Sequence, residues 1–203
     1  KFFAFFYLLV LFCLKKKDQQ DEERREKIEI RRYSTSKWEY KMSALAYTFG
    51  YYSKSIGSKI EHFLIQNKIE VMHIHDMVAA EGAMFANRDL KLPVFLDLHE
   101  NRPEIMRFYP HLNKFPGKAL ISVEKWKRKE EELVQKADRV IVVTDEAAKD
   151  LAQRAELDPK KLAVVPNTVK SSFFENYHID DALIKRYKGK FVLLYLGDTG
   201  LRR

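Results

Sequence analysis

The segment from Ala137 to Val169 constrains the fold more than any other part of the chain, because it reads as one strand–helix–strand unit. Arg139–Val143 is a short β-branched apolar run without alternation, which is typical of a parallel strand covered on both faces. Thr144 can cap the helix that follows, and apolar residues recur along that helix at helical spacing. Asp158–Pro159 breaks the helix, and Leu162–Val165 forms the next strand. The segment therefore predicts a β-α-β unit.

The rest of the chain repeats this alternation of strands and helices. We expect further strands at Leu8–Leu14, Ile28–Arg32, Glu70–Ile74, Pro93–Leu98 and Phe191–Leu196, and helices near 49–67, 78–86 and 122–136. Asp180–Tyr187 reads as a short helix or a linker. Lys15–Lys27 reads as a charged connector. Asn101–Phe115 is interrupted by prolines and reads as a loop long enough to suggest binding. Strands that alternate with helices favour an α/β fold with an open parallel sheet.

Charge and cysteine content narrow the possible partners and the compartment. The 203 residues carry a formal net charge of +8, which favours anionic partners such as phosphates, acidic lipid surfaces or nucleic acid. A solvated basic surface explains the same charge without a partner. The single cysteine, Cys13, excludes an intramolecular disulfide framework and fits a reducing compartment.

Phe2–Leu14 is an apolar run that allows two interpretations. It is shorter than the roughly 20 residues that a membrane-spanning helix needs. We favour an internal strand, with a membrane-anchoring or signal segment as the alternative. We also expect the chain to be a fragment, because it begins with Lys1 and stops at Arg203, just after a glycine-rich turn.

Polar side chains gather where the predicted strands end. Parallel sheets bind ligands outside the carboxyl ends of their strands, so these residues are the first candidates for a site. They are His75, Asp76, Asp97, His99, Glu100, Thr144 and Asn167. His73 and His75 lie two apart and would point to the same face of a strand. With His99 they could ligate zinc, although no cysteine supports such a site.

The order and spacing of several motifs resemble the family-4 retaining glycosyltransferases of the two-domain GT-B fold. The motifs are Ala-Asp-x-Val-Ile-x-Val-Thr at 137–144, a helix, and Val-x-Pro-Asn at 164–167. The resemblance covers nearly the whole chain. It implies a Rossmann-like, acceptor-side domain at 1–188 that lacks its first strand, with helices on both faces of the sheet. It also implies the start of the nucleotide-sugar-binding domain at 189–203.

The resemblance assigns roles to residues on the acceptor side. Phe-Leu-Asp-Leu-His-Glu at 95–100 is similar to the family segment whose histidine lies at the cleft, which makes His99 the catalytic candidate. The alternative is a capping histidine bonded to the backbone. His75 and Asp76 resemble residues that line the cleft, where we also place Glu100, Asn101 and Thr144. The alternative for His75 and Asp76 is a polar pair at the strand end whose hydrogen bonds are satisfied within the protein. Glu130 lies eight positions before Asp138, as a glutamate of the family does, but we favour a salt bridge on the helix surface for it. Asn167 follows the family's Pro-Asn and suits a turn.

On the donor side, the resemblance implies that Gly197, Arg202 and Arg203 bind the diphosphate of a nucleoside-diphosphate sugar. Asp198 stands where many relatives carry a basic residue. The family's paired glutamates belong to the C-terminal domain, and no segment here supplies them. The resemblance implies neither a bound cofactor nor a metal ion, because this fold class transfers sugars without one.

The function that follows from the resemblance is hexosyl transfer, with retention, from a nucleotide sugar to a glycan or lipid-linked acceptor in polysaccharide biosynthesis. We expect the fragment alone to be inactive. We expect a cytoplasmic protein, with a peripheral seat on the inner face of an anionic membrane as a further hypothesis. Two alternatives are a nucleotide-sugar epimerase of the same architecture and a non-catalytic Rossmann-like module that binds nucleic acid. We expect no nucleic-acid partner, because Trp38 and Tyr40 are the only grouped aromatics near basic residues.

Overall fold

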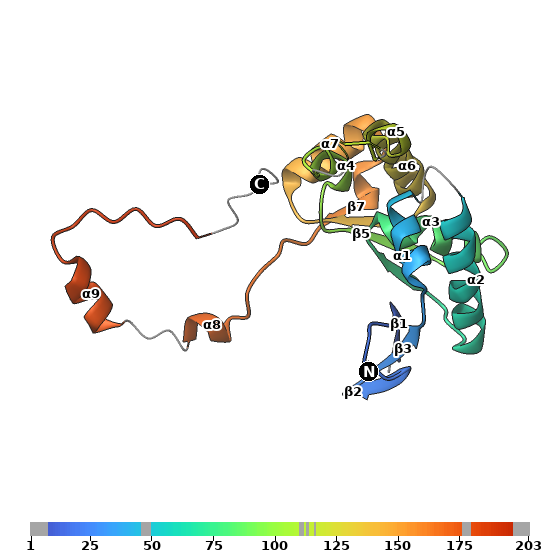
Figure 1. Ribbon diagram of the computed structural model, residues 1–203, viewed down its shortest axis with the longest axis horizontal. Helices are drawn as coiled ribbons and strands as arrows, with labels where there is room; N and C mark the ends of the chain where they lie inside the picture. The colour runs from blue at the N-terminus through green and yellow to red at the C-terminus, as the bar shows by residue number, and fades with distance from the viewer. Residues whose placement is uncertain are drawn as a thin grey trace. The chain divides into compact units, whose positions relative to one another are not determined.

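The computed structural model describes residues 8–45, 50–109, 112, 114–115, 117–175 and 180–196 (Figure 1). The chain divides into two compact units, Lys1–Val165 and Pro166–Arg203. The candidate site lies in the first unit.

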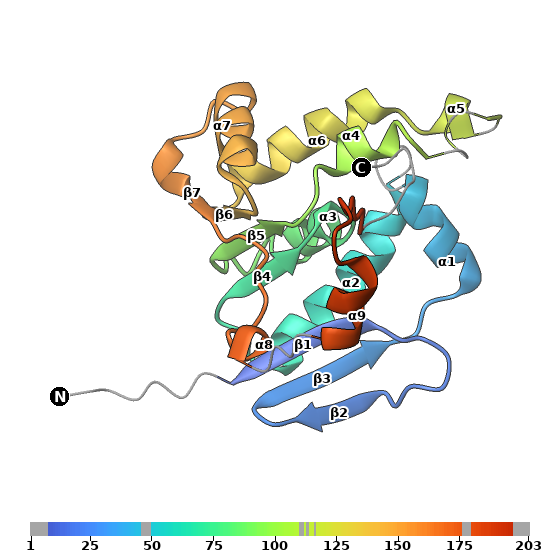
Figure 2. The same cartoon turned by 90° about the vertical axis from the view of Figure 1, so that its left-hand side faces the viewer.

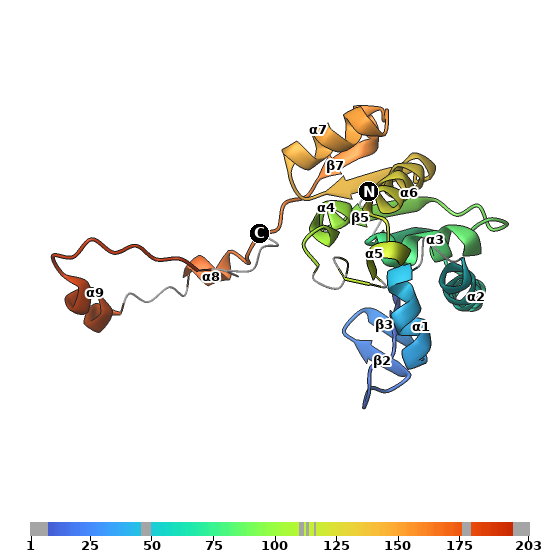
Figure 3. The same cartoon turned by 45° about the horizontal axis from the view of Figure 1, so that its top comes forward.

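A four-stranded, all-parallel sheet forms the centre of the first unit. Its strands lie in the order β4-β5-β6-β7, which is also their order in the sequence. They are β4 (Met72–His75), β5 (Val94–Leu98), β6 (Arg139–Val142) and β7 (Leu162–Val164), connected through α3 (Met77–Ala86), α4 (Arg102–Met106), α5 (Gly117–Leu120), α6 (Val123–Lys136) and α7 (Asp145–Arg154). Helices flank this sheet, and α7 lies against β6 and β7 (Figure 3). The predicted α/β class with an open parallel sheet is confirmed.

A second, three-stranded sheet is formed by β1 (Leu9–Leu14), β3 (Ile28–Tyr33) and β2 (Glu22–Arg25), in the order β1-β3-β2 (Figure 2). β1 runs parallel to β3, so the internal-strand interpretation holds for Leu9–Leu14. Residues 2–7 of the predicted apolar run lie outside the described residues. β2 corrects the prediction that Lys15–Lys27 is only a connector. Its charged residues pair across the ladder, as with Glu23 and Arg32, whose side-chain atoms lie 2.5 Å apart.

Aromatic side chains join this second sheet to the helix that follows it. After α1 (Lys37–Met42) and η1 (Ser43–Leu45), the chain forms α2 (Tyr51–Gln66). The Phe12 ring stacks on Tyr33 with centroids 4.7 Å apart and meets Phe63 of α2 edge-on at 5.5 Å. α2 in turn packs closely on α3. A Cβ atom added to Gly82 would lie 2.3 Å from Ile56 Cγ2, so only glycine permits this approach.

The parallel sheet has one deeply buried face. Along β4, buried Met72 and Ile74 alternate with exposed His73 and His75. β5 and β6 contribute Leu96, Leu98, Val140 and Val142 to the same buried face. His73 and His75 project from the opposite face of the sheet, where they stay accessible although their backbone belongs to a strand.

A buried ion pair joins α6 to α7 and corrects the expectation of a surface salt bridge. Glu130 is only 2% exposed, although it lies on a helix rich in charged residues. Its carboxylate pairs with Arg154, which also binds Glu131 and Asp150. Burial raises the pKa of Glu130 above its ordinary value, and Arg154 opposes that rise. The sequence spacing alone placed Glu130 on a helix but could not place α7 over it.

The second unit contains short helices and extended chain. The first unit ends after η3 (Pro159–Lys161) and β7. The helices of the second unit are α8 (Ser172–Glu175) and α9 (Asp181–Tyr187), and a helix was among the structures expected at the position of α9. The expected strand at Phe191–Leu196 does not form in the described part of the chain, and its side chains are exposed. A strand needs hydrogen bonds from a neighbouring strand, and the two sheets formed by the described residues do not include this segment.

Candidate functional site

The candidate site lies where β4, β5 and β6 end. His75 is the last residue of β4, His99 directly follows β5, and Thr144 lies two positions after the end of β6. The parallel ladders place His75 opposite Asp97 and Leu98 opposite Val142. The strand ends therefore meet at one edge of the sheet, as predicted, and His75 and His99 lie in direct contact there.

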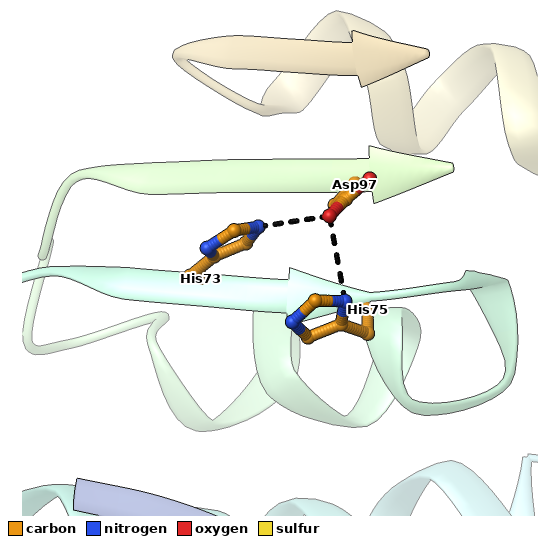
Figure 4. A group of neighbouring side chains, drawn as sticks. All are labelled: His73, His75 and Asp97. Carbon is orange, nitrogen blue, oxygen red and sulfur yellow. Dashed lines mark hydrogen bonds and ion pairs between the residues drawn. The ribbon is translucent and has the colours of Figure 1, made fainter. Parts of the chain in front are cut away.

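Asp97 is the centre of this group of side chains. It is 7% exposed, and one of its carboxylate oxygens, Oδ2, faces three imidazole rings. That oxygen lies 3.2 Å from His73 Nε2, 3.4 Å from His75 Nδ1 and 3.3 Å from His99 Nε2. Figure 4 shows His73 and His75 reaching Asp97 from the neighbouring strand. We call these four residues the histidine–aspartate cluster.

The three rings of the cluster form a short stack. His73 and His75 have centroids 4.6 Å apart at 19°, and His75 and His99 have centroids 5.2 Å apart at 4°. His75 Nδ1 lies 3.0 Å from His99 Nε2, so one ring nitrogen donates a hydrogen bond and the other accepts it, according to the tautomers of the two rings. The described contacts of the His99 ring are to side chains. The alternative of a histidine that caps the backbone stays a prediction.

Asp76 has an unusual backbone conformation between β4 and α3. Its φ of 60° and ψ of 167° lie in a region that glycine adopts freely and other residues rarely adopt. Its N–H donates to the Asp97 carbonyl oxygen at 2.8 Å, and its side chain does not cap α3. Strain of this kind costs about 1–3 kcal/mol and is concentrated at functional sites.

The other predicted cleft residues have structural contacts of their own. Thr144 caps α7, because its hydroxyl accepts a hydrogen bond from the Ala147 N–H at 3.1 Å. Asn101 caps α4 by accepting from the Glu104 N–H at 3.4 Å. The predicted loop at 101–115 thus begins with a short helix, which corrects the loop interpretation over that part. Glu100 is exposed beside His99.

The predicted diphosphate-binding residues Gly197, Arg202 and Arg203 lie outside the described residues, so their role stays a prediction. Asn167 is exposed in the second unit, where no helix or strand is assigned to it.

Sequence reasoning named Asp97 among the strand-end residues but gave it no role. The sequence did contain a signal for this role. His75 and Asp97 lie near the ends of two consecutive predicted strands, and a parallel register places them side by side. The strain at Asp76 had no sequence signal, since an aspartate after a strand fits several backbone conformations.

The fold and the cluster define an α/β protein with a polar site at the carboxyl edge of a Rossmann-like parallel sheet. The family model described as Glycosyltransferase Family 4 matches residues 9–173, which is most of the chain. The chain therefore belongs to glycosyltransferase family 4, and its domain is that of a transferase. A comparison with curated proteins found no match. Among the described residues, no helix is both long enough and apolar enough to cross a membrane.

Proposed function

We propose that this chain forms the acceptor side of a retaining glycosyltransferase. The complete reaction moves a hexose from a nucleoside-diphosphate sugar to a hydroxyl group of a glycan or lipid-linked acceptor. The observation that carries the proposal is the position of His99, whose partly exposed ring is held by buried Asp97 at the edge of the sheet. The family membership supplies the reaction class.

The cluster can orient a sugar hydroxyl. Asp97 holds the rings of His75 and His99 in fixed orientations, while 54% and 40% of their side-chain surfaces remain accessible. A ring nitrogen held in this way can accept a proton from a hydroxyl or donate one to it. Fixing the attacking oxygen before reaction lowers the entropic part of the barrier. Strained Asp76 borders the same edge and supports a functional role for it.

The donor side of the proposal rests on sequence alone. Gly197 lets backbone amides approach the diphosphate, and Arg202 and Arg203 neutralise the charge that develops as the diphosphate leaves. We place the domain boundary between 188 and 189, so that 189–203 opens the donor-binding domain. Without the rest of that domain, we expect acceptor binding without turnover.

Ligand-observed NMR tests the acceptor proposal directly on the 203-residue chain. Saturation transfer is measured to a panel of oligosaccharides and to a short polyprenyl phosphate, with EDTA present throughout. His99→Ala removes a hydrogen bond of about 0.5–1.5 kcal/mol, which weakens acceptor binding by about two- to tenfold. His62→Ala is the matched control, because His62 is an exposed histidine on α2 outside the cluster. Acceptor binding that is equal in both variants would refute the assignment.

The basic surface adds a proposal about location. A net charge of +8 suits a peripheral seat on an anionic membrane, where lipid-linked acceptors reside. Sedimentation with vesicles tests this point. Binding should rise with the fraction of acidic lipid and fall with salt, and binding that ignores both would exclude the membrane seat.

A further inference from the structure

The histidine–aspartate cluster has the dimensions of a metal site. His75 Nδ1, Asp97 Oδ2 and His99 Nε2 form a triangle with sides of 3.4, 3.3 and 3.0 Å. Ligand atoms at about 2.0–2.1 Å from a tetrahedral zinc ion lie about 3.3–3.4 Å from one another. The three donor atoms thus already lie close to the spacing of one face of such a tetrahedron.

A fourth donor lies beside this triangle. His73 Nε2 is 3.2 Å from Asp97 Oδ2, and the ligand atoms of His73, His75 and Asp97 all lie within 4.8 Å of one another. His73 and His75 project from the same face of β4 because side chains two apart on a strand share a face. Because the three rings are stacked nearly parallel, the rings would have to rotate about their side-chain torsions to bring all four donors to one ion.

The chemistry of the donors selects the kind of ion. Three imidazoles and one carboxylate suit zinc and neighbouring divalent transition metals, whereas calcium and magnesium prefer oxygen ligands. The backbone of Asp97 is held in place, because it lies within β5 and its carbonyl oxygen accepts the Asp76 N–H. The histidine side chains are 40–54% exposed, so an ion can enter from solvent.

We propose that His73, His75, Asp97 and His99 bind one divalent transition-metal ion, with zinc as the best match. The inference rests on the geometry and not on the proposed acceptor function. If that function also holds, zinc and acceptor compete, because the ion takes up the same ring nitrogens of His75 and His99.

The test is a metal titration of the full chain after EDTA treatment and buffer exchange. Cobalt(II) is the spectroscopic probe, since a tetrahedral site gives it strong visible absorption, and zinc is then titrated by calorimetry and by displacement of cobalt. We expect one ion per chain. His75→Ala and His99→Ala should each weaken zinc binding by more than about 100-fold, because losing even an outer-shell partner costs about 10- to 100-fold. His62→Ala should leave zinc binding unchanged.

Two further variants keep the outcome clear. Asp97→Asn retains the shape of the side chain but removes its charge, so it should lower zinc affinity in a protein whose circular dichroism is unchanged. The exposed positions of His75 and His99 mean that their alanine variants lose no core packing and should fold. Absence of cobalt absorption at millimolar metal would overturn the proposal. Zinc binding that survives in the His75→Ala/His99→Ala double variant would also overturn it, by assigning the ion to other residues.

Discussion

The backbone strain at Asp76 can be measured separately from the contribution of its carboxylate. Asp76→Gly and Asp76→Ala both remove that carboxylate, but only glycine adopts a φ of 60° with a ψ of 167° freely. Relief of strain favours the glycine variant by about 1–3 kcal/mol. The greater flexibility of glycine in the unfolded chain costs roughly 0.5–1 kcal/mol. The glycine variant should therefore be more stable than the alanine variant by about 1 kcal/mol.

Urea denaturation followed by circular dichroism measures this difference. With a slope of about 2 kcal/mol/M, the unfolding midpoint of Asp76→Gly should lie about 0.5 M above that of Asp76→Ala. The matched control is Lys149, an exposed residue within α7. There the order should reverse, and Lys149→Gly should be less stable than Lys149→Ala by about 1 kcal/mol. A midpoint for Asp76→Gly at or below that of Asp76→Ala would refute the strain argument.

Three more predictions concern packing and buried charge. Gly82→Ala places a methyl group 2.3 Å from Ile56 Cγ2, and this overpacking should lower the free energy of unfolding by about 1–3 kcal/mol. That loss exceeds the gain of about 1 kcal/mol from the higher helix propensity of alanine. A higher urea midpoint for the variant would contradict this prediction. Arg154→Leu leaves buried Glu130 without its partner and should cost about 3–5 kcal/mol in the same assay, whereas an unchanged midpoint would show that the pair is solvated. Hydrogen bonds from Lys59, Ser55 and the Ser36 N–H lower the pKa of Glu39 from 4.5 to about 2. Its stabilisation is therefore present above pH 4.5 and is lost as the pH falls towards 2, so Glu39→Gln should flatten the acid limb of a stability–pH curve.

Local patterns were enough to predict the β-α-β unit of the first compact unit. The cap at Thr144, the break at Asp158–Pro159 and the apolar run of β6 each depend on residues only a few positions apart. Those interactions form in almost any context that buries the strand, so they can be read from the sequence. The same reasoning predicted that the ends of parallel strands would share an edge.

Features that depend on distant partners could not be read in this way. β2 is a strand because Glu22–Arg25 pairs with β3, where Glu22 lies opposite Arg31 and Arg24 opposite Glu29, and its own composition indicated only a connector. Glu130 is buried because α7 brings Arg154 over it from 24 positions away. Composition indicated a connector in the first case and an exposed side chain in the second, and in each a partner from elsewhere in the chain changed the outcome.

The candidate site also combines features that local sequence determines with features that depend on distant partners. The sequence by itself determined that His73 and His75 share a face of β4, because side chains alternate along any strand, and that His99 directly follows the next strand. Only the tertiary structure decided that β4 and β5 pair in the register that puts Asp97 between the three rings. The physical reason is that register and the positive φ of Asp76 are fixed by packing over the whole sheet and α3, and no short stretch of residues contains that information.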